Sequence, residues 1–137
     1  MDNTEKISLQ KIFNLAWEHF IVRDEPPAVH EGSCTYLTPD GRKCAVGLAL
    51  PDGHPSQGAG VPLGDLVDRY PPLFSNGVRR TQRSKLNRFQ FLLHDSLVSR
   101  GGIIEKSWVY SLDERKEEYL RVAHEYGLTV PEDSAAR

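Results

Sequence analysis

Cysteine and methionine are scarce in this chain, and long apolar runs are missing. The 137 residues include two cysteines and one methionine, and the longest apolar run covers positions 45–50 and ends at Pro51. Two cysteines cannot build a disulfide-rich scaffold, and six apolar residues are far too few to cross a bilayer. The opening residues MDNTE lack the basic and apolar segments of a secretory signal. We therefore expect a cytoplasmic protein with reduced cysteines and no membrane contact.

Neither sign of charge dominates the whole chain. It has 17 basic and 19 acidic residues, a formal net charge of −2, and 39% hydrophobic residues. These values are typical of globular proteins and exclude extended disorder or a collagen-like fold. The length predicts one globular domain over residues 1–130, followed by a flexible tail over residues 131–137.

Four helices are predicted from apolar residues that recur every three or four positions, over residues 9–20, 63–70, 81–100 and 111–126. Ser8 or Thr4 is placed to cap the first helix, and Thr81 the third. The fourth begins with a capping box, in which Ser111 and Glu114 satisfy each other's backbone donors.

A β-hairpin is predicted between the first two helices. Residues 34–37 are strand-like, Thr38-Pro39-Asp40-Gly41 has the composition of a tight turn, and residues 43–46 would return. Side chains alternate across a strand, so Cys34 and Cys44 would lie close together on one face. The expected fold class is α+β, with about four helices packed around this small antiparallel hairpin.

Charge is strongly segregated along the chain. Residues 69–94 contain no acidic residue, and the rest of the chain carries a net charge of −8. The segment holds six cations: Arg69, Arg79, Arg80, Arg83, Lys85 and Arg88. Cations in the first turns of a helix oppose its dipole, at about 0.3–1 kcal/mol each when exposed. A bound anion would reverse that effect, because backbone N–H groups and guanidinium forks would all face it.

Two kinds of site are conceivable around the cysteines. A cysteine-dependent hydrolase or transferase would use Cys44 as the nucleophile with His94 and Asp95, although neighbouring residues on a helix do not face each other. A zinc-stabilised module would use Cys34, Cys44, His30 and His54, although the C-x9-C spacing is wider than in most structural zinc sites. Buried packing of the thiols is the third reading, and one of His94 and Asp95 would then make a buried hydrogen bond near the hairpin.

Several segments together resemble a small domain found in bacterial and phage-derived proteins. The segments that carry the resemblance are Cys34-x-Tyr36, Gly41-Arg42-Lys43-Cys44-Ala45-Val46-Gly47, Leu50-Pro51-Asp52, Phe91-Leu92-Leu93-His94-Asp95, Trp108 and Val122-Ala123-His124-Glu125-Tyr126-Gly127-Leu128. The resemblance implies no established activity. It implies that Cys34, Cys44, His94 and Asp95 belong to the framework of the domain, and that the chain is phage or mobile-element borne.

The functional expectation is a small non-enzymatic binding protein without a cofactor. Its partner would be an anionic macromolecule or a phosphate-bearing ligand, such as a host protein, a nucleotide or a nucleic acid. The binding residues would be those at the start of the predicted third helix: Arg79, Arg80, Arg83, Lys85 and Arg88. A merely solvated helix face is the alternative interpretation of these cations.

Overall fold

The computed structural model describes residues 6–131 of the chain. Six α-helices occur in this part: α1 (Leu9–Ala16), α2 (Ala45–Ala49), α3 (Leu63–Arg69), α4 (Asn76–Arg80), α5 (Arg83–Leu93) and α6 (Leu112–Tyr126). Shorter helical turns are η1 (Trp17–Val22), η2 (Pro55–Gly58), η3 (Pro71–Leu73) and η4 (Asp95–Val98). Two small antiparallel hairpins pair β1 (Val29–His30) with β2 (Ser33–Cys34), and β3 (Ser99–Arg100) with β4 (Ile103–Ile104). The predicted α+β class is confirmed.

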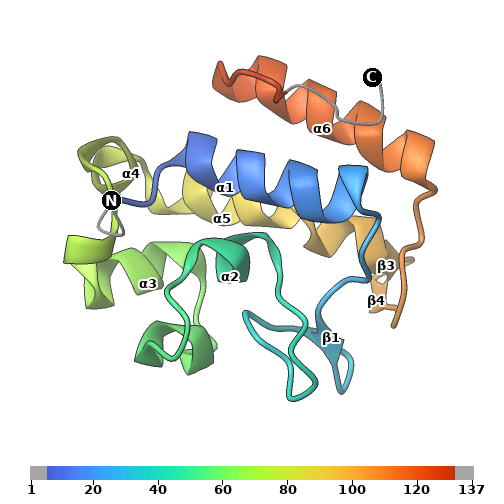
Figure 1. The fold of residues 1–137 in the computed structure, drawn as a ribbon, viewed down its shortest axis with the longest axis horizontal. Helices are drawn as coiled ribbons and strands as arrows, with labels where there is room; N and C mark the ends of the chain where they lie inside the picture. Colours follow the sequence, from blue (N-terminus) through green and yellow to red (C-terminus); the bar gives the residue numbers. More distant parts are fainter. Residues whose placement is uncertain (1–5, 132–137) are drawn as a thin grey trace.

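The helices enclose one aromatic core. α6 lies along one side of the molecule and α2 and α3 lie on the opposite side (Figure 1). Helix α1 packs on α2, and α5 contacts both α3 and α6. Phe13, Trp17 and Tyr119 meet with ring centroids 5.7–6.3 Å apart, and each side chain is at most 2% exposed. Among residues 6–131, no helix combines the length and the apolar character needed to cross a membrane.

Two predicted helices have the local signals that the sequence indicates. The Ser8 side chain accepts a hydrogen bond from the Lys11 N–H at the start of α1, and the helical path continues through η1. Ser111 and Glu114 form the complete capping box of α6, and Gly127 ends that helix at a φ of 67°. Glycine reaches this left-handed conformation without the strain that a Cβ would add.

The hairpin prediction is only partly correct. The turn at residues 38–41 forms, since the Gly41 N–H donates to the Thr38 carbonyl over 2.9 Å, but the arms share a single bridge between Leu37 and Lys43. The regular hairpin is formed by the preceding segment, in which β1 pairs with β2 and Val29 lies opposite Cys34. The predicted return arm is instead α2, because Cys44 caps a helix: its Sγ accepts from the Gly47 N–H over 3.4 Å.

The predicted third helix is divided into three elements. Thr81 ends α4, and Gln82 begins α5 without a side-chain cap, so the prediction that Thr81 caps the long helix is wrong. Helix α5 stops at Leu93, and His94 leaves helical geometry at φ −145° and ψ −62°. η4 and the β3–β4 hairpin follow, with Gly101 and Gly102 at the turn. Of the predicted tail, residues 132–137 lie outside the described residues.

Candidate functional site

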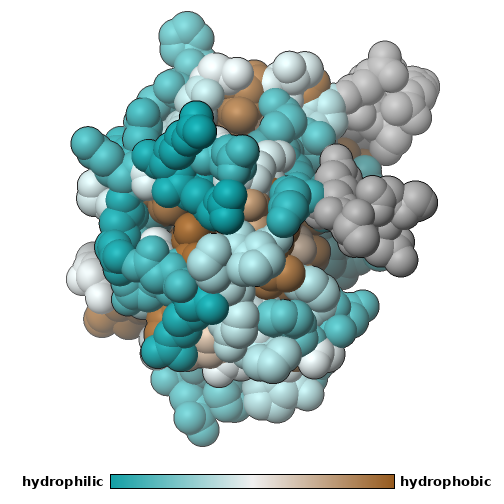
Figure 2. Space-filling view, turned by 90° about the vertical axis from the view of Figure 1, so that its left-hand side faces the viewer, coloured by the Kyte–Doolittle hydropathy of each residue, from teal (hydrophilic) through white to brown (hydrophobic). Residues whose placement is uncertain are grey.

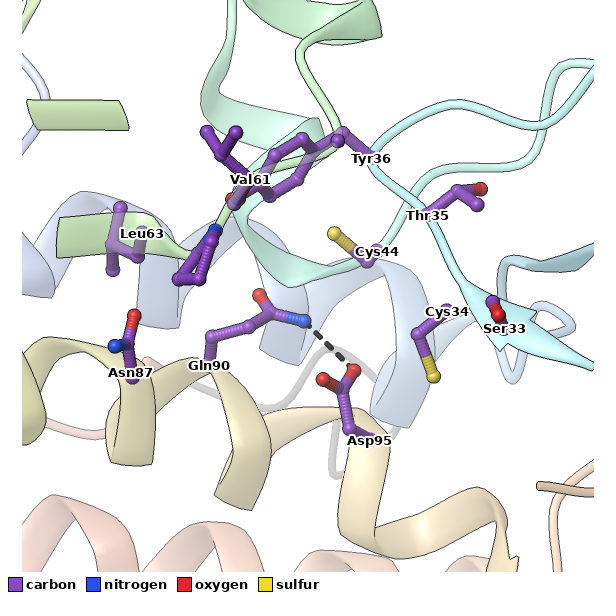
Figure 3. Close-up of a pocket in the computed structure, with 12 residues that line it drawn as sticks. Ser33, Cys34, Thr35, Tyr36, Cys44, Val61, Leu63, Asn87, Gln90 and Asp95 are labelled. Carbon is purple, nitrogen blue, oxygen red and sulfur yellow. Dashed lines mark hydrogen bonds between the residues drawn. The ribbon is translucent and has the colours of Figure 1, made fainter. Parts of the chain in front are cut away.

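A pocket of about 540 Å³ opens between β2, the segment just before α3, and α5 (Figure 3). Both cysteines line it, Cys34 from β2 and Cys44 from the start of α2. Tyr36, Val61 and Leu63 add apolar wall, and α5 contributes Gln90. Pockets of this size with apolar walls and few polar groups are the usual form of small-ligand sites.

Asp95 carries the only formal charge among the residues that line the pocket. Its Oδ1 accepts two hydrogen bonds, from Gln90 Nε2 over 3.0 Å and from His94 Nδ1 over 2.8 Å. The side chain is 28% exposed, so it is neither sealed in the core nor freely solvated. Two donors from the protein therefore fix the orientation of this carboxylate at the pocket surface.

The hydrogen bonds of His94 determine its tautomer. The backbone N–H of Ala28 donates to Nε2 over 3.0 Å, and an N–H group can only donate. Nε2 must therefore be unprotonated, and the proton of the neutral ring lies on Nδ1, from which it is donated to Asp95. The side chain is fully buried and contacts the rings of Phe20 and Trp108. Both ring nitrogens therefore have a hydrogen-bond partner within the protein.

The expectation of a buried hydrogen bond from His94 or Asp95 to the backbone near the hairpin is confirmed by the Ala28 contact. The argument that Asp95 cannot orient His94 is wrong. It assumed that both residues continue the helix, but α5 ends at Leu93 and the backbone turns at His94. That turn brings the two adjacent side chains together.

Both thiols are held in the protonated form. Burial raises the pKa of Cys34, and the negative charge of the neighbouring Asp95 raises it further. In Figure 3 the Cys34 sulfur lies beside the Asp95 carboxylate. Burial also raises the pKa of Cys44 from 9.0 to about 12. Neither cysteine carries an appreciable fraction of the nucleophilic thiolate at neutral pH.

The candidate catalytic set is only partly assembled. Cys34, rather than Cys44, meets His94 and Asp95, with the potential ligand or reacting atoms all within 4.8 Å of one another. Cys44 faces the same pocket and accepts from Gly47. The sequence reasoning treated Cys34 as a partner of Cys44 on a strand, and nothing local to Cys34 indicated its contact with residues 60 positions away.

The candidate zinc ligands do not come together. His54 Nδ1 pairs with the Ser56 hydroxyl over 2.8 Å, and His30 lies 3.8 Å from Glu31 Oε2. Among residues 6–131, the one group of three potential ligands is Cys34, His94 and Asp95. This group does not fit a metal, because a ligating nitrogen must give up its proton while the Ala28 N–H still requires Nε2 as acceptor.

The predicted basic site lies on exposed parts of α4 and α5, and several of its cations have internal partners. The Arg83 guanidinium forks onto Asp65 and Asp68 of α3, and Arg88 lies 3.6 Å from Glu125 of α6. Lys85 lies 5.9 Å from the centroid of the Tyr126 ring, and Arg79 donates to Asn76 over 2.6 Å. Arg80 is exposed and has no ion-pair partner among residues 6–131.

The end of the molecule that carries α3 and α4 presents mainly hydrophilic residues (Figure 2). The two carboxylates beside Arg83 offset its positive charge, which weakens its attraction for an external anion. The basic segment is therefore less available than its charge alone predicts.

Comparison with protein-family models, with curated proteins and with solved structures gives no match to this chain. The function must therefore be argued from the site itself.

Proposed function

We propose that this chain is a small binding protein whose pocket holds a positively charged group of its ligand against Asp95. The observation that carries this proposal is the single charge in the pocket, fixed in place by Gln90 and His94. Charges attract more strongly in a partly desolvated pocket than on an open surface. A carboxylate that is already oriented also loses little freedom when it binds.

The chemistry of the pocket favours binding over cysteine catalysis. A cysteine nucleophile needs a thiolate and a base that can accept its proton. Cys34 and Cys44 have raised pKa values, and the only unprotonated nitrogen of His94 is taken by Ala28. We expect iodoacetamide at pH 7.5 to alkylate both cysteines far more slowly in the native protein than in urea. Rapid native labelling of Cys34 or Cys44 would favour the cysteine-dependent hydrolase or transferase instead.

Binding is tested with four probes that share a short alkyl chain but differ in charge. The probes are n-pentylammonium, n-pentylguanidinium, neutral pentan-1-ol and anionic hexanoate, titrated by NMR of the backbone amides. At least one of the two cations should bind ten times more tightly than pentan-1-ol, with shifts centred on Asp95 and Cys34, and hexanoate should not bind.

The matched variants are Asp95→Asn and Asp52→Asn. Asp52 is an exposed carboxylate outside the pocket, paired with Lys43, so its variant should retain the affinity. Asp95→Asn should lose most of it. Equal binding of pentan-1-ol and both cations by the wild-type protein would overturn the proposal, whether or not Asp95→Asn folds.

A second candidate function is docking of an anionic macromolecule through the basic segment. The observation that favours it is a set of three exposed arginines, Arg69, Arg79 and Arg80, that have no carboxylate partner among residues 6–131. A charge reversal at Arg79 and Arg80 should abolish salt-sensitive binding to heparin as a model polyanion. Reversal of Arg83, which is already paired with Asp65 and Asp68, should have a smaller effect. Unchanged heparin binding by the Arg79 and Arg80 variant would overturn this candidate.

A further inference from the structure

The remaining hydrogen-bonding capacity of Asp95 limits what it can bind. A carboxylate offers about four lone-pair positions, two on each oxygen. Gln90 and His94 both donate to Oδ1, so the acceptor positions that remain free lie on Oδ2. A ligand therefore meets only one oxygen of the carboxylate that still has free acceptor positions.

From this we infer that the pocket selects a primary alkylammonium group over a guanidinium group, an inference that rests on the function proposed above. A guanidinium binds a carboxylate best as a fork, with two parallel N–H groups on the two oxygens. Oδ1 is already filled by two donors from the protein, so the fork would have to displace one of them. An ammonium is a compact point charge that needs only one free acceptor position.

The pocket walls suit the alkyl stem of such a ligand. Tyr36, Val61 and Leu63 lie on the side of the pocket away from Asp95 (Figure 3). The protonated Cys44 thiol lines the same pocket and behaves as a small apolar group. A chain of four or five methylene groups would lie against this wall while its ammonium group reaches Asp95. Free primary alkylamines and lysine side chains of peptides share this chemistry.

One buried polar group among the residues that line the pocket has no hydrogen-bond partner. The Thr35 hydroxyl oxygen is buried and has no hydrogen-bond partner within the described part of the chain. It follows Cys34 directly and lines the same pocket. In Figure 3 this hydroxyl is directed away from Asp95, so an ammonium group held at Asp95 does not depend on it.

The test compares head groups on one alkyl chain in the wild-type protein, so it does not depend on the folding of a variant. Calorimetric titration should give n-pentylammonium at least fivefold higher affinity than n-pentylguanidinium. The trimethylated analogue, which keeps the charge but has no N–H donor, should bind more weakly than both. Asp95→Asn should remove the preference between ammonium and guanidinium, and Asp52→Asn should preserve it.

Nα-acetyl-lysine methylamide distinguishes the two ligand sources. Binding as tight as that of n-pentylammonium assigns the pocket to lysine side chains, and at least tenfold weaker binding assigns it to free amines. Equal affinity for ammonium and guanidinium, both dependent on Asp95, would overturn the selectivity while leaving the proposed cation site in place. No binding of either head group would overturn the selectivity and the proposed function together.

Discussion

The tautomer of His94 shows how a single backbone group determines the chemistry of a residue. The Ala28 N–H occupies Nε2, so the Nδ1 proton is directed to Asp95. A histidine beside a cysteine and an aspartate would otherwise indicate a catalytic triad. In this chain the imidazole orients a carboxylate, and burial together with the charge of that carboxylate keeps the neighbouring Cys34 thiol protonated.

Gly47 is a second residue whose surroundings restrict its identity, because they leave no room for a side chain. A Cβ at this position would overlap the backbone carbonyl oxygen of Tyr36, where α2 packs on the segment that leads out of β2. The absence of a side chain thus permits the close approach that places Cys44 and Tyr36 in the same pocket.

Gly47→Ala should therefore lower the free energy of unfolding by about 2–3 kcal/mol, because backbone must move to relieve the overlap. Gly58→Ala is the matched control: no atom lies within 4 Å of its Cβ position, and we expect a change below about 0.5 kcal/mol. Urea denaturation of both variants measures the difference. Equal stability of the two variants would contradict the close approach.

At the scale of elements, the contact between α3 and α5 combines charge with shape. A Cβ on Gly64 of α3 would meet the Arg83 side chain, so the arginine stem lies directly over this glycine. Its guanidinium then reaches Asp65 and Asp68 on the same helix. The arrangement makes Arg83 a clamp between two helices, although all three charged side chains are about half exposed.

Because exposed ion pairs contribute little, Arg83→Ala should cost no more than about 1 kcal/mol of stability. A double-mutant cycle with Asp68→Ala should give a coupling energy of about 0.2–1 kcal/mol that shrinks in 1 M salt. Arg80→Ala, which removes an arginine without an ion-pair partner among residues 6–131, is the control and should leave stability unchanged. A coupling energy of zero at low salt would mean that the clamp forms no net interaction.

At the scale of the whole molecule, the buried ionisable groups make stability sensitive to alkaline pH. Burial raises the pKa values of Cys34, Tyr36, Cys44 and Tyr119. In each case the folded chain holds its proton to higher pH than the unfolded chain does. The resulting stabilisation is complete below the unfolded pKa of about 9 to 10 and is lost as pH rises above it.

Urea midpoints should therefore stay level between pH 7 and 8.5 as far as these groups are concerned, and should fall above pH 9. For Cys44, whose pKa rises from 9.0 to about 12, the loss at pH 10 amounts to about 1 kcal/mol. Cys44→Ala should be less stable at pH 7 but should lose less stability between pH 8.5 and 10. The same alkaline loss in this variant and the wild type would show that Cys44 is not the source.

The sequence by itself determined the elements whose stabilising contacts are local. The capping box of Ser111 and Glu114, the turn at residues 38–41 and the apolar face of α1 all depend on residues a few positions apart. The recurring apolar residues also predicted most of the helices that dominate the fold, whereas the two regular hairpins, β1–β2 and β3–β4, were not predicted.

Only the tertiary structure decided the site. Ala28 and His94 are 66 residues apart, and Val46 donates to Gln90 across 44 residues. Contacts over such distances depend on how whole elements pack, which no local pattern contains. No local pattern predicted that α5 would end before His94. This end turns the adjacent side chains of His94 and Asp95 toward each other. The basic segment was evident from composition, but its pairing with Asp65 and Asp68 became visible only once α3 lay against α5.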